Sequence, residues 1–430
     1  MLNNTRHSAF DATTRGKENL MHSSQNNQNQ KLALQNIKVV DLSRLLPGPW
    51  CTQMLGDLGA DIIKIEAPTT GDPSRHNPPL LTNSSVYFNS VNRNKRSIVI
   101  DLRNAKGHEV ALRLLETADV VIESFSVGVA AKLGIDYETI KKINPNVIYC
   151  SITGFGQTGP LALSPGHDLV IQASAGMLGV TERTLDDNCQ VPSFQSADYA
   201  AGAVACIGVL AALRRRDQDG HGCYIDLGMF DSLMSMSNIV MTGALGRASG
   251  ATGTPMAQVW GRNPRYTVYP TGDDKWIAVS LLEPKLWRRF CEAIGQPSLA
   301  AQHEQPSERL SDHGERGKQY RAAVAAYCMA NSRDEISQKM EALDIPVCPV
   351  LTPDEALNSP HTAVREMLEY AEHPVQGTIA QIGNPLKHSG LVDTKQRPAP
   401  ILGANTQDIL TELGYSADQQ SALSKLGAIF

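Results

Sequence analysis

The sequence has little that would bind nucleic acid or hold the chain in a membrane. Its 39 Lys and Arg residues are outnumbered by 44 Asp and Glu residues, which gives a formal net charge of −5. Nucleic-acid-binding proteins carry a basic patch or stripe, and this charge balance argues against one. No apolar run reaches the roughly 20 residues that cross a bilayer. We therefore expect neither nucleic acid nor a membrane among the partners.

The eight cysteines lack the spacing of metal sites and of redox motifs. None belongs to a CxxC pair, and several lie within apolar runs. Disulfides are rare in the cytoplasm, where thiols are kept reduced. We expect buried, reduced thiols in a cytoplasmic protein, with no metal site.

Several catalytic and nucleotide-binding motifs are also missing, namely the Walker P-loop, HExxH and GxSxG. One glycine pattern, Gly154-x-Gly156-x-x-Gly159, matches the dinucleotide fingerprint. That fingerprint needs a helix that begins at the glycines, so that its N-terminus faces a pyrophosphate. Pro160 and Pro165 interrupt such a helix, so we do not expect a dinucleotide site here.

The amino-acid composition is that of an ordinary globular protein, except over the first 35 residues. Apolar residues make up 42% of the chain and charged residues 19%, and the length suits two domains. Residues 1–35 are rich in Asn, Gln, Ser and His. We expect them to form a disordered N-terminal extension, because they cannot bury enough apolar surface to order themselves. They contain no apolar segment of the kind found in secretory signals.

Short apolar runs alternate with helical segments along the first half of the chain. We predict strands at 37–42, 61–66, 97–102, 120–123, 146–152 and 223–227, and helices at 50–58, 105–118, 137–143 and 198–214. Strands joined by helices form βαβ units, so the pattern predicts a parallel sheet covered by helices.

The pattern changes after Arg216. We predict an apolar helix at 229–242, a mobile Gly-, Ala- and Thr-rich loop at 243–264, a hairpin of 265–269 with 276–280, and helices at 284–294, 315–330 and 333–343. These elements suggest a smaller domain at about 225–335.

Six motifs together resemble the class III CoA-transferases, which include formyl-CoA and carnitine CoA-transferases, and their relatives the 2-methylacyl-CoA racemases. They are Pro47-Gly48-Pro49, the stretch 55–66, Asn94-Lys95-Arg96-Ser97-Ile98, Gly154-Phe155-Gly156-Gln157, Gly166-His167-Asp168 and Pro346-Val347-Cys348-Pro349-Val350. The likeness runs from about residue 37 to residue 426. It is specific for this superfamily and less specific for the reaction.

The resemblance implies an α/β architecture with a Rossmann-like large domain formed by both chain ends, 36–224 and 336–430. A smaller α+β domain, 225–335, is inserted between them. It also implies a homodimer whose subunits interlock like rings. A coenzyme A (CoA) thioester would be bound as a substrate, with no permanently bound cofactor.

The resemblance further implies basic side chains on the phosphates of CoA. Arg103 and Lys132 match those positions, and Arg75 and Arg96 are weaker candidates. Charge-assisted contacts with phosphate are strong, although a solvated surface charge is the alternative for each residue. Backbone at Gly154, Phe155 and Gly156 is expected to approach the ligand closely, since glycine has no side chain.

For a transferase, the resemblance implies that Asp168 is the nucleophile. Its carboxylate would attack an acyl-CoA thioester, and CoA would then form an aspartyl-CoA thioester that an acceptor acid reopens. The alternative role for Asp168 is a helix N-cap before Leu169. Backbone N–H groups of residues 154–159 or 243–253 would stabilise the oxyanion.

For a racemase, the resemblance implies two acid/base groups that flank the α-carbon of an acyl-CoA. His167 and Asp198 match them, and Glu283 matches a supporting carboxylate. Asp198 and Glu283 have structural alternatives, as an N-cap and as a first-turn helix carboxylate. Motif details divide between the two reactions and favour the transferase slightly. A third hypothesis is a catalytically silent CoA-binding protein.

Overall fold

The computed structural model describes residues 31–82, 84–179, 191–253, 261–300, 304–306, 308–392 and 396–430. The described chain divides into two compact units. The first contains the described residues up to Gln172 together with Ser193–Leu233 and Pro360–Phe430. The second contains those of Ala173–Pro192 and Met234–Ser359.

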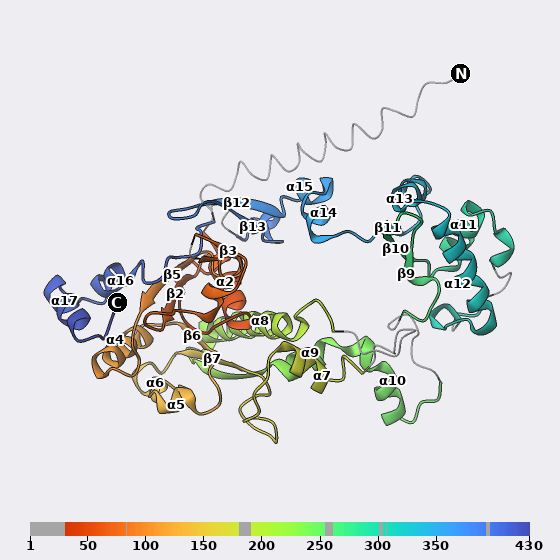
Figure 1. Ribbon diagram of the computed structural model, residues 1–430. Helices are drawn as coiled ribbons and strands as arrows, with labels where there is room; N and C mark the ends of the chain where they lie inside the picture. The colour runs from red at the N-terminus through yellow and green to blue at the C-terminus, as the bar shows by residue number, and fades with distance from the viewer. Residues whose placement is uncertain are drawn as a thin grey trace. The chain divides into compact units, whose positions relative to one another are not determined.

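A six-stranded parallel sheet is the centre of the first unit (Figure 1). Its strands are β1 (Lys38–Leu42), β2 (Asp61–Glu66), β5 (Lys95–Val99), β6 (Val120–Glu123), β7 (Ile148–Thr153) and β8 (Cys223–Gly228). Their order is β5-β2-β1-β6-β7-β8, and all neighbours are parallel. The chain adds strands outward from β1 on one side and then, from β6, on the other, which is the order of a doubly wound Rossmann-like sheet. The predicted α/β class with a parallel sheet is confirmed.

Helices and short strands complete this unit. The helices are α2 (Pro47–Asp57), α3 (Val86–Val91), α4 (Ala105–Glu116), α5 (Val129–Lys132), α6 (Tyr137–Ile143), α7 (Asp168–Ser174), α8 (Ser196–Asp219), α15 (Pro360–Val364), α16 (Thr406–Glu412) and α17 (Ala417–Lys425), with 3₁₀ turns η1 (Pro73–His76) and η5 (Lys387–Ser389). The short strand pairs are β3 (Leu80–Leu81) with β4 (Ser84–Ser85), and β12 (Leu368–His373) with β13 (Gly377–Ile382). Side-chain caps define several starts: Asn104 accepts from two backbone N–H groups of α4, and Asp136 does the same for α6.

The end of the chain packs into the core of the first unit. Ile409 and Leu410 of α16 are fully buried in the same cluster as Ile63 and Ile98 of the sheet. Asn405 accepts a hydrogen bond from the backbone N–H of Ser97 at 3.0 Å, and α16 lies beside β5 (Figure 1). At the other end, Leu34 is buried, so ordered chain begins within the predicted extension 1–35, whose first 30 residues lie outside the described part.

Helix α8 is long and apolar enough to cross a membrane by length and composition alone. In the structure it packs against α2 and against β7 and β8, and its small residues allow this close approach. A Cβ atom on Gly202 would lie 2.7 Å from Cε3 of Trp50 and 2.8 Å from the carbonyl oxygen of Pro47. Glycine is therefore needed where α2 and α8 cross.

The second unit contains a three-stranded sheet of order β11-β10-β9. Its strands are β9 (Tyr266–Pro270), β10 (Trp276–Ser280) and β11 (Val347–Pro349), and its helices are α10 (Asn238–Ala248), α11 (Pro284–Ala293), α12 (Gly314–Met329), α13 (Arg333–Ala342) and α14 (Pro353–Leu357), with 3₁₀ turns η3 (Pro297–Leu299) and η4 (Glu308–Leu310). The predicted hairpin is confirmed, since β9 and β10 are antiparallel. Trp287, Phe290, Tyr320 and Val324 form the core with the inner face of this sheet.

Three local predictions need correction. The helix predicted over 229–242 is two helices, α9 (Met229–Met236) and α10, which are separated at Ser237. The loop predicted at 243–264 begins later, because α10 continues to Ala248; residues 254–260 lie outside the described part. Strand β8 pairs with β7, so residues 225–228 belong to the six-stranded sheet and not to the domain expected at 225–335.

Candidate active site

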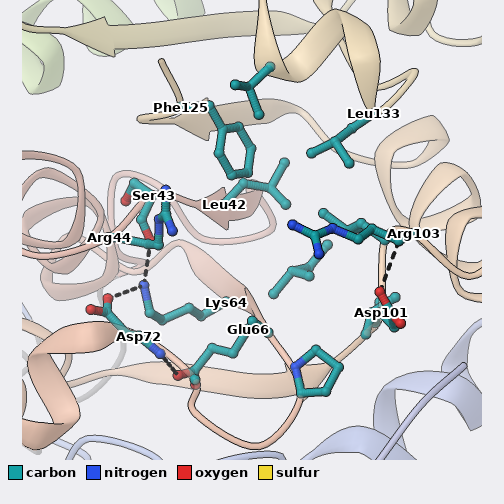
Figure 2. A pocket seen from close by; sticks show the side chains of 17 residues that line it. Leu42, Ser43, Arg44, Lys64, Glu66, Asp72, Asp101, Arg103, Phe125 and Leu133 are labelled. Atoms are coloured by element: carbon teal, nitrogen blue, oxygen red, sulfur yellow. Dashed lines mark hydrogen bonds and ion pairs between the residues drawn. The ribbon is translucent and has the colours of Figure 1, made fainter. Parts of the chain in front are cut away.

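A cavity of about 490 Å³ lies at the carboxyl ends of β1, β2, β5 and β6 (Figure 2). It is lined by Leu42, Ser43, Arg44, Lys64, Ile65, Glu66, Ala67, Pro68, Gly71, Asp72, Ile100, Asp101, Leu102, Arg103, Phe125, Val129 and Leu133. Strands β1 and β6 are neighbours whose connections leave in opposite directions. Ligands of doubly wound sheets bind in the crevice at such a switch point, and the volume suits a small-molecule site.

Lys64 carries a buried charge at this cavity. Its Nζ lies 3.0 Å from Asp72 and 3.7 Å from Asp41, and it donates to the carbonyl oxygen of Ser43 at 2.8 Å. Burial opposes the charged form of Lys64, but the negative charges of Asp41 and Asp72 outweigh it and raise the pKa. The ammonium is therefore neutralised by protein carboxylates.

Asp41 joins Lys64 to a second buried lysine. Lys95 donates to Asp41 at 3.1 Å, to Asn92 at 2.8 Å and to the carbonyl oxygen of Pro49 at 2.8 Å. Burial lowers the pKa of Lys95 to about 8, although Asp41 partly offsets it. Two lysines and two aspartates thus form a compact network of alternating charge, which ties the strand ends to the start of α2.

The four predicted phosphate-binding cations have different surroundings. Arg75 is buried and makes a bidentate ion pair with Glu66 at 2.6 and 2.7 Å. Arg96 pairs with Asp61 at 2.6 Å and with Glu412 at 2.7 Å. The ion pairs engage both guanidinium groups, and neither residue lines the cavity.

Arg103 lines the cavity, and its guanidinium extends into it (Figure 2). Lys132, on α5, is exposed and adjacent to the lining residue Leu133. Arg44 is a further lining cation that sequence reasoning missed. Its position directly after the first strand is the signal that would have identified it, because that position is at the ligand-binding edge of the sheet.

Asp168 and Asp198 form a second polar centre in the first unit. One oxygen of Asp168 accepts from the backbone N–H groups of Ala197 at 2.8 Å and Asp198 at 3.2 Å. The other accepts from Gln172 at 2.6 Å. Asp168, the first residue of α7, therefore caps the N-terminus of the other helix, α8, which is a favourable place for a negative charge.

Asp198 lies in the first turn of α8 without such support. In the described part of the chain, no hydrogen bond to its carboxylate is found. Burial and the charge of Asp168 raise the pKa of Asp198 to about 7. A carboxyl group poised near neutral pH, beside a second carboxylate, is a frequent feature of catalytic sites.

Aromatic side chains pack around Tyr199, the residue that follows Asp198. Tyr199 packs edge-on against Trp50 at 5.3 Å and stacks on Phe194 at 5.1 Å between ring centroids. Burial, followed by the charges of Asp198 and Asp72, raises the pKa of Tyr87 on α3. Asp72 lines the cavity and Asp198 belongs to the second polar centre, so the charges of both act on the Tyr87 hydroxyl.

The remaining predicted catalytic residues are His167 and Glu283. His167 is exposed, and its carbonyl oxygen accepts from Val170 and Ile171 at the start of α7. Glu283 belongs to the second unit, where it precedes α11 and pairs with Arg309 at 3.5 Å. It makes no side-chain cap to that helix.

The glycine loop after β7 faces carboxylates of its own chain. The Gln157 N–H donates to Asp226 at 3.0 Å, and a Cβ atom on Gly156 would lie 3.7 Å from Asp226 and 3.8 Å from Asp231. Two carboxylates beside these backbone groups disfavour a bound phosphate. Gly154, Phe155 and Gly156 also lie outside the cavity lining.

Comparison with known proteins gives a consistent result. The family model described as CoA-transferase family III matches residues 34–406. The chain is 35% identical to an acetyl-CoA:oxalate CoA-transferase of Acetobacter aceti, over 85% of this chain and 91% of that protein. It is 32% identical to a succinyl-CoA:mesaconate CoA-transferase of Haloarcula marismortui, over 89% and 96% of the two chains. A crystal structure of a CAIB/BAIF family protein from Brucella suis superimposes with a TM-score of 0.75 and 32% identity, covering 89% of this chain and 100% of that one.

Proposed function

We propose that this chain, which belongs to CoA-transferase family III, transfers CoA from an acyl-CoA donor to a small carboxylic acid through a covalent intermediate on Asp198. The similar proteins are named for oxalate and mesaconate, which makes a dicarboxylic acid the favoured acceptor class. One observation carries the proposal, namely the placement of the partly buried Asp198 carboxylate in the first turn of α8 beside Asp168; the raised pKa of Asp198 agrees with it.

The hydrogen bonds of the two aspartates support the choice of Asp198 over Asp168 as the proposed nucleophile. Sequence analysis put the nucleophile at Asp168, but three donors engage the oxygens of that side chain. Attack would break contacts that hold the start of α8. Among the described residues, no hydrogen bond holds the carboxylate of Asp198, and its partial desolvation leaves the carboxylate more reactive.

The proposed reaction consists of four balanced steps. The Asp198 carboxylate attacks the thioester carbonyl carbon and expels CoA thiolate, which leaves an acyl-aspartyl anhydride. The thiolate then attacks the aspartyl carbonyl, releases the donor acid as a carboxylate and forms the aspartyl-CoA thioester. The acceptor carboxylate displaces the thiolate to form a second anhydride. Thiolate attack on the acceptor carbonyl of this anhydride yields the new acyl-CoA and restores Asp198.

Asp168 has a positioning role in this scheme. It holds the first turn of α8, and its negative charge raises the pKa of Asp198. His167 and Asp198 were the acid/base pair of the alternative racemase hypothesis. The similar proteins are named as transferases, which favours transfer of CoA over exchange of an α-proton.

The cavity at the strand ends is the proposed binding site for the nucleotide end of CoA. Arg103 projects into it and Lys132 lies next to its wall, so both predicted cations stay candidates for the phosphates. Following the family resemblance, we also propose an interlocked homodimer that works in the cytoplasm. Exposed apolar side chains on α8, such as Ile207 at 63% exposure, are consistent with a covered surface in such an assembly.

The test is to trap the intermediate on wild-type, Asp198→Asn and Asp168→Asn proteins. Each is incubated with acetyl-CoA or succinyl-CoA, treated with hydroxylamine or borohydride, and its peptides are analysed by mass spectrometry. We expect an adduct at Asp198 in the wild type and a loss of transfer to oxalate of at least about 10³-fold in Asp198→Asn, the scale for loss of a catalytic group. Asp168→Asn should keep the adduct with reduced activity.

Two results would contradict this mechanism. An adduct at Asp168 that survives in Asp198→Asn would restore the assignment made from sequence. Incorporation of deuterium at the α-carbon of a 2-methylacyl-CoA in deuterium oxide, without an adduct, would support the racemase.

A further inference from the structure

Gln172 is a buried glutamine beside the two aspartates, and the proposed reaction steps do not use it. It lies one turn after Asp168 on α7 and is only 3% exposed. Its Nε2 atom donates to Oδ2 of Asp168 at 2.6 Å and to the carbonyl oxygen of Phe194 at 3.1 Å. Both partners are acceptors, so the amide nitrogen and not the amide oxygen must face them. These two bonds fix the orientation of the Gln172 side chain.

The same two bonds tie α7 to the start of α8. Phe194 lies two residues before the first residue of α8, so Gln172 holds the chain that enters this helix. The two oxygens of Asp168 are divided: Oδ2 accepts from Gln172, and Oδ1 accepts from two backbone N–H groups in the first turn of α8. Rotation of the carboxylate would break bonds on both sides. The Gln172 amide therefore keeps the negative charge of Asp168 directed at the turn that carries Asp198.

The direction of this charge matters for Asp198. Burial is the larger cause of the raised pKa of Asp198, about 7, and the charge of Asp168 is the second. A hydrogen bond from an N–H group favours the charged form of a carboxylate. Loss of the Gln172 amide frees Asp168 to turn away from α8 or to take up a proton. Either change reduces the negative charge beside Asp198, which would then ionise at a lower pH.

We propose that Gln172 is a positioning residue for the nucleophile: it holds the charge of Asp168 against the start of α8 and so sets the pH at which Asp198 becomes a reactive carboxylate. The inference rests on the proposed function, because it takes Asp198 to be the attacking group. Gln172 acts through Asp168 and not on the substrate. Its loss should therefore change the ionisation of Asp198 and kcat, with little change in the KM for acyl-CoA.

Other titratable groups near the pair are Tyr87, Tyr199 and His167. Burial and the charge of Asp198 raise the pKa of both tyrosines, so they stay uncharged near pH 7. His167 is exposed and directly precedes Asp168, and a histidine titrates in the same pH range as Asp198. Every measurement below is therefore repeated in the His167→Gln background, where the difference caused by Gln172 should persist.

The first test measures the protonation of Asp198 without turnover. Wild-type and Gln172→Met proteins are treated with a water-soluble carbodiimide and glycinamide across a pH series. The carbodiimide activates a protonated carboxyl group, the amine converts it to an amide, and mass spectrometry of peptides gives the extent at Asp198. We expect the modification to fall around pH 7 in the wild type. In Gln172→Met its midpoint should lie about one pH unit lower, the scale of one hydrogen bond to a charged group.

Gln53→Met is the matched control. Gln53 is also 3% exposed, and its amide oxygen accepts from the backbone N–H of Arg93 at 3.1 Å. The variant loses a buried hydrogen bond of the same unit, so it should lower stability without moving the midpoint at Asp198. If Gln172→Met does not fold, Gln172→Asn takes its place, since its shorter amide cannot make both bonds and should shift the midpoint in the same direction. An unchanged or higher midpoint, or an equal shift in Gln53→Met, would overturn the inference.

The second test is the pH dependence of kcat/KM for CoA transfer from acetyl-CoA to oxalate. The acid limb of Gln172→Met should move to lower pH by the same amount as the midpoint of modification, with a reduced maximum. A role of Gln172 in stability alone would lower the maximum and leave the limb in place, which would also overturn the inference. Absence of transfer in the wild type would contradict the proposed function alone, because the midpoints of modification do not depend on turnover.

Discussion

The carboxylate of Asp168 accepts a hydrogen bond from the backbone N–H of Asp198, but the two carboxylates have different surroundings. Asp168 receives three donors, whereas Asp198 is desolvated beside a like charge. A carboxyl group whose pKa is higher in the folded than in the unfolded state binds extra protons when folded. Such a group lowers stability at any pH where it must ionise.

Asp198→Asn should therefore stabilise the protein while it abolishes transfer. Between the ordinary pKa of 3.8 and about 7, the folded state holds a proton that the unfolded state has released, so the stability of the wild type falls as the pH rises. Above about pH 7 Asp198 is ionised in both states, and the loss of stability that it causes no longer grows with pH. We expect Asp198→Asn to raise the free energy of unfolding by about 1–3 kcal/mol at pH 8, a discounted value from 1.36 kcal/mol per pKa unit, with a smaller gain at pH 5.5.

Urea unfolding at the two pH values measures this effect. Asp217→Asn, at an exposed position of the same helix, should change neither value. A loss of stability in Asp198→Asn at pH 8 would show that the carboxylate is favourably solvated, and the raised pKa would then be wrong.

The ion-pair partners of single arginines could not be predicted from the sequence. Arg75 lies in η1 after β2, Arg96 lies in β5, and Arg103 follows β5; the sequence around each arginine does not say what its guanidinium binds. Arg75 pairs with Glu66 on the preceding strand, and Arg96 pairs with Glu412 near the chain end. Such partners are brought together only by the tertiary fold, so the sequence could not tell a structural ion pair from a free ligand-binding cation.

At the scale of elements, α2 and α8 meet at one glycine. A methyl group on Gly202 would collide with the carbonyl oxygen of Pro47, which has no rotamer by which to move. Gly202→Ala should lower the free energy of unfolding by about 1–3 kcal/mol, as overpacking does. Because α8 begins at the residues around Asp198, a shift of this helix should also reduce transfer.

Gly208 provides the matched comparison on the same helix. A Cβ atom there would lie 3.7 Å from Ile225, an ordinary contact, and alanine is a better helix former than glycine by up to about 1 kcal/mol. Gly208→Ala should be neutral or stabilising in thermal unfolding. Equal destabilisation of both variants would rule out a steric constraint at the crossing.

Elements with strong apolar patterns were predicted well. The strand at 120–123 and the helix at 137–143 have the predicted bounds, because each apolar run is bounded by capping or turn residues. The helix 229–242 was predicted as continuous because its apolar composition does not change at Ser237. The break there places α9 and α10 largely in different units, and apolar content carries no information about such a division.

For the whole molecule, the chain end is part of the first core. Ile409 is fully buried among residues of the sheet and α4. Ile409→Ala should lower the free energy of unfolding by about 2–4 kcal/mol, through lost transfer energy and a cavity. Ile382→Ala, at a site 51% exposed on β13, should cost much less. Similar losses in denaturant titrations would mean that α16 contributes little to the core.

The packing of the chain end in the core of the first unit could be expected only from the family resemblance. Helical patterns at 406–412 and 417–425 are short, and their apolar positions do not name the sheet on which they pack. The place of the cavity follows more directly from the fold class, because ligands of sheets with alternating strands and helices bind at the switch point of the strand order. The strand order itself comes from pairings that the sequence does not record.

Repulsion between Asp168 and Asp198 has a consequence for the energy profile of the reaction. When Asp198 becomes an anhydride or a thioester in the proposed mechanism, it loses its negative charge, and Asp168 keeps its hydrogen bonds from Gln172 and the start of α8 with no like charge at Asp198. In the proposed mechanism, covalent modification of Asp198 therefore removes the repulsion between the two carboxylates. Loss of this repulsion would stabilise the covalent intermediates relative to the free enzyme, and each turnover would end by restoring the repulsion.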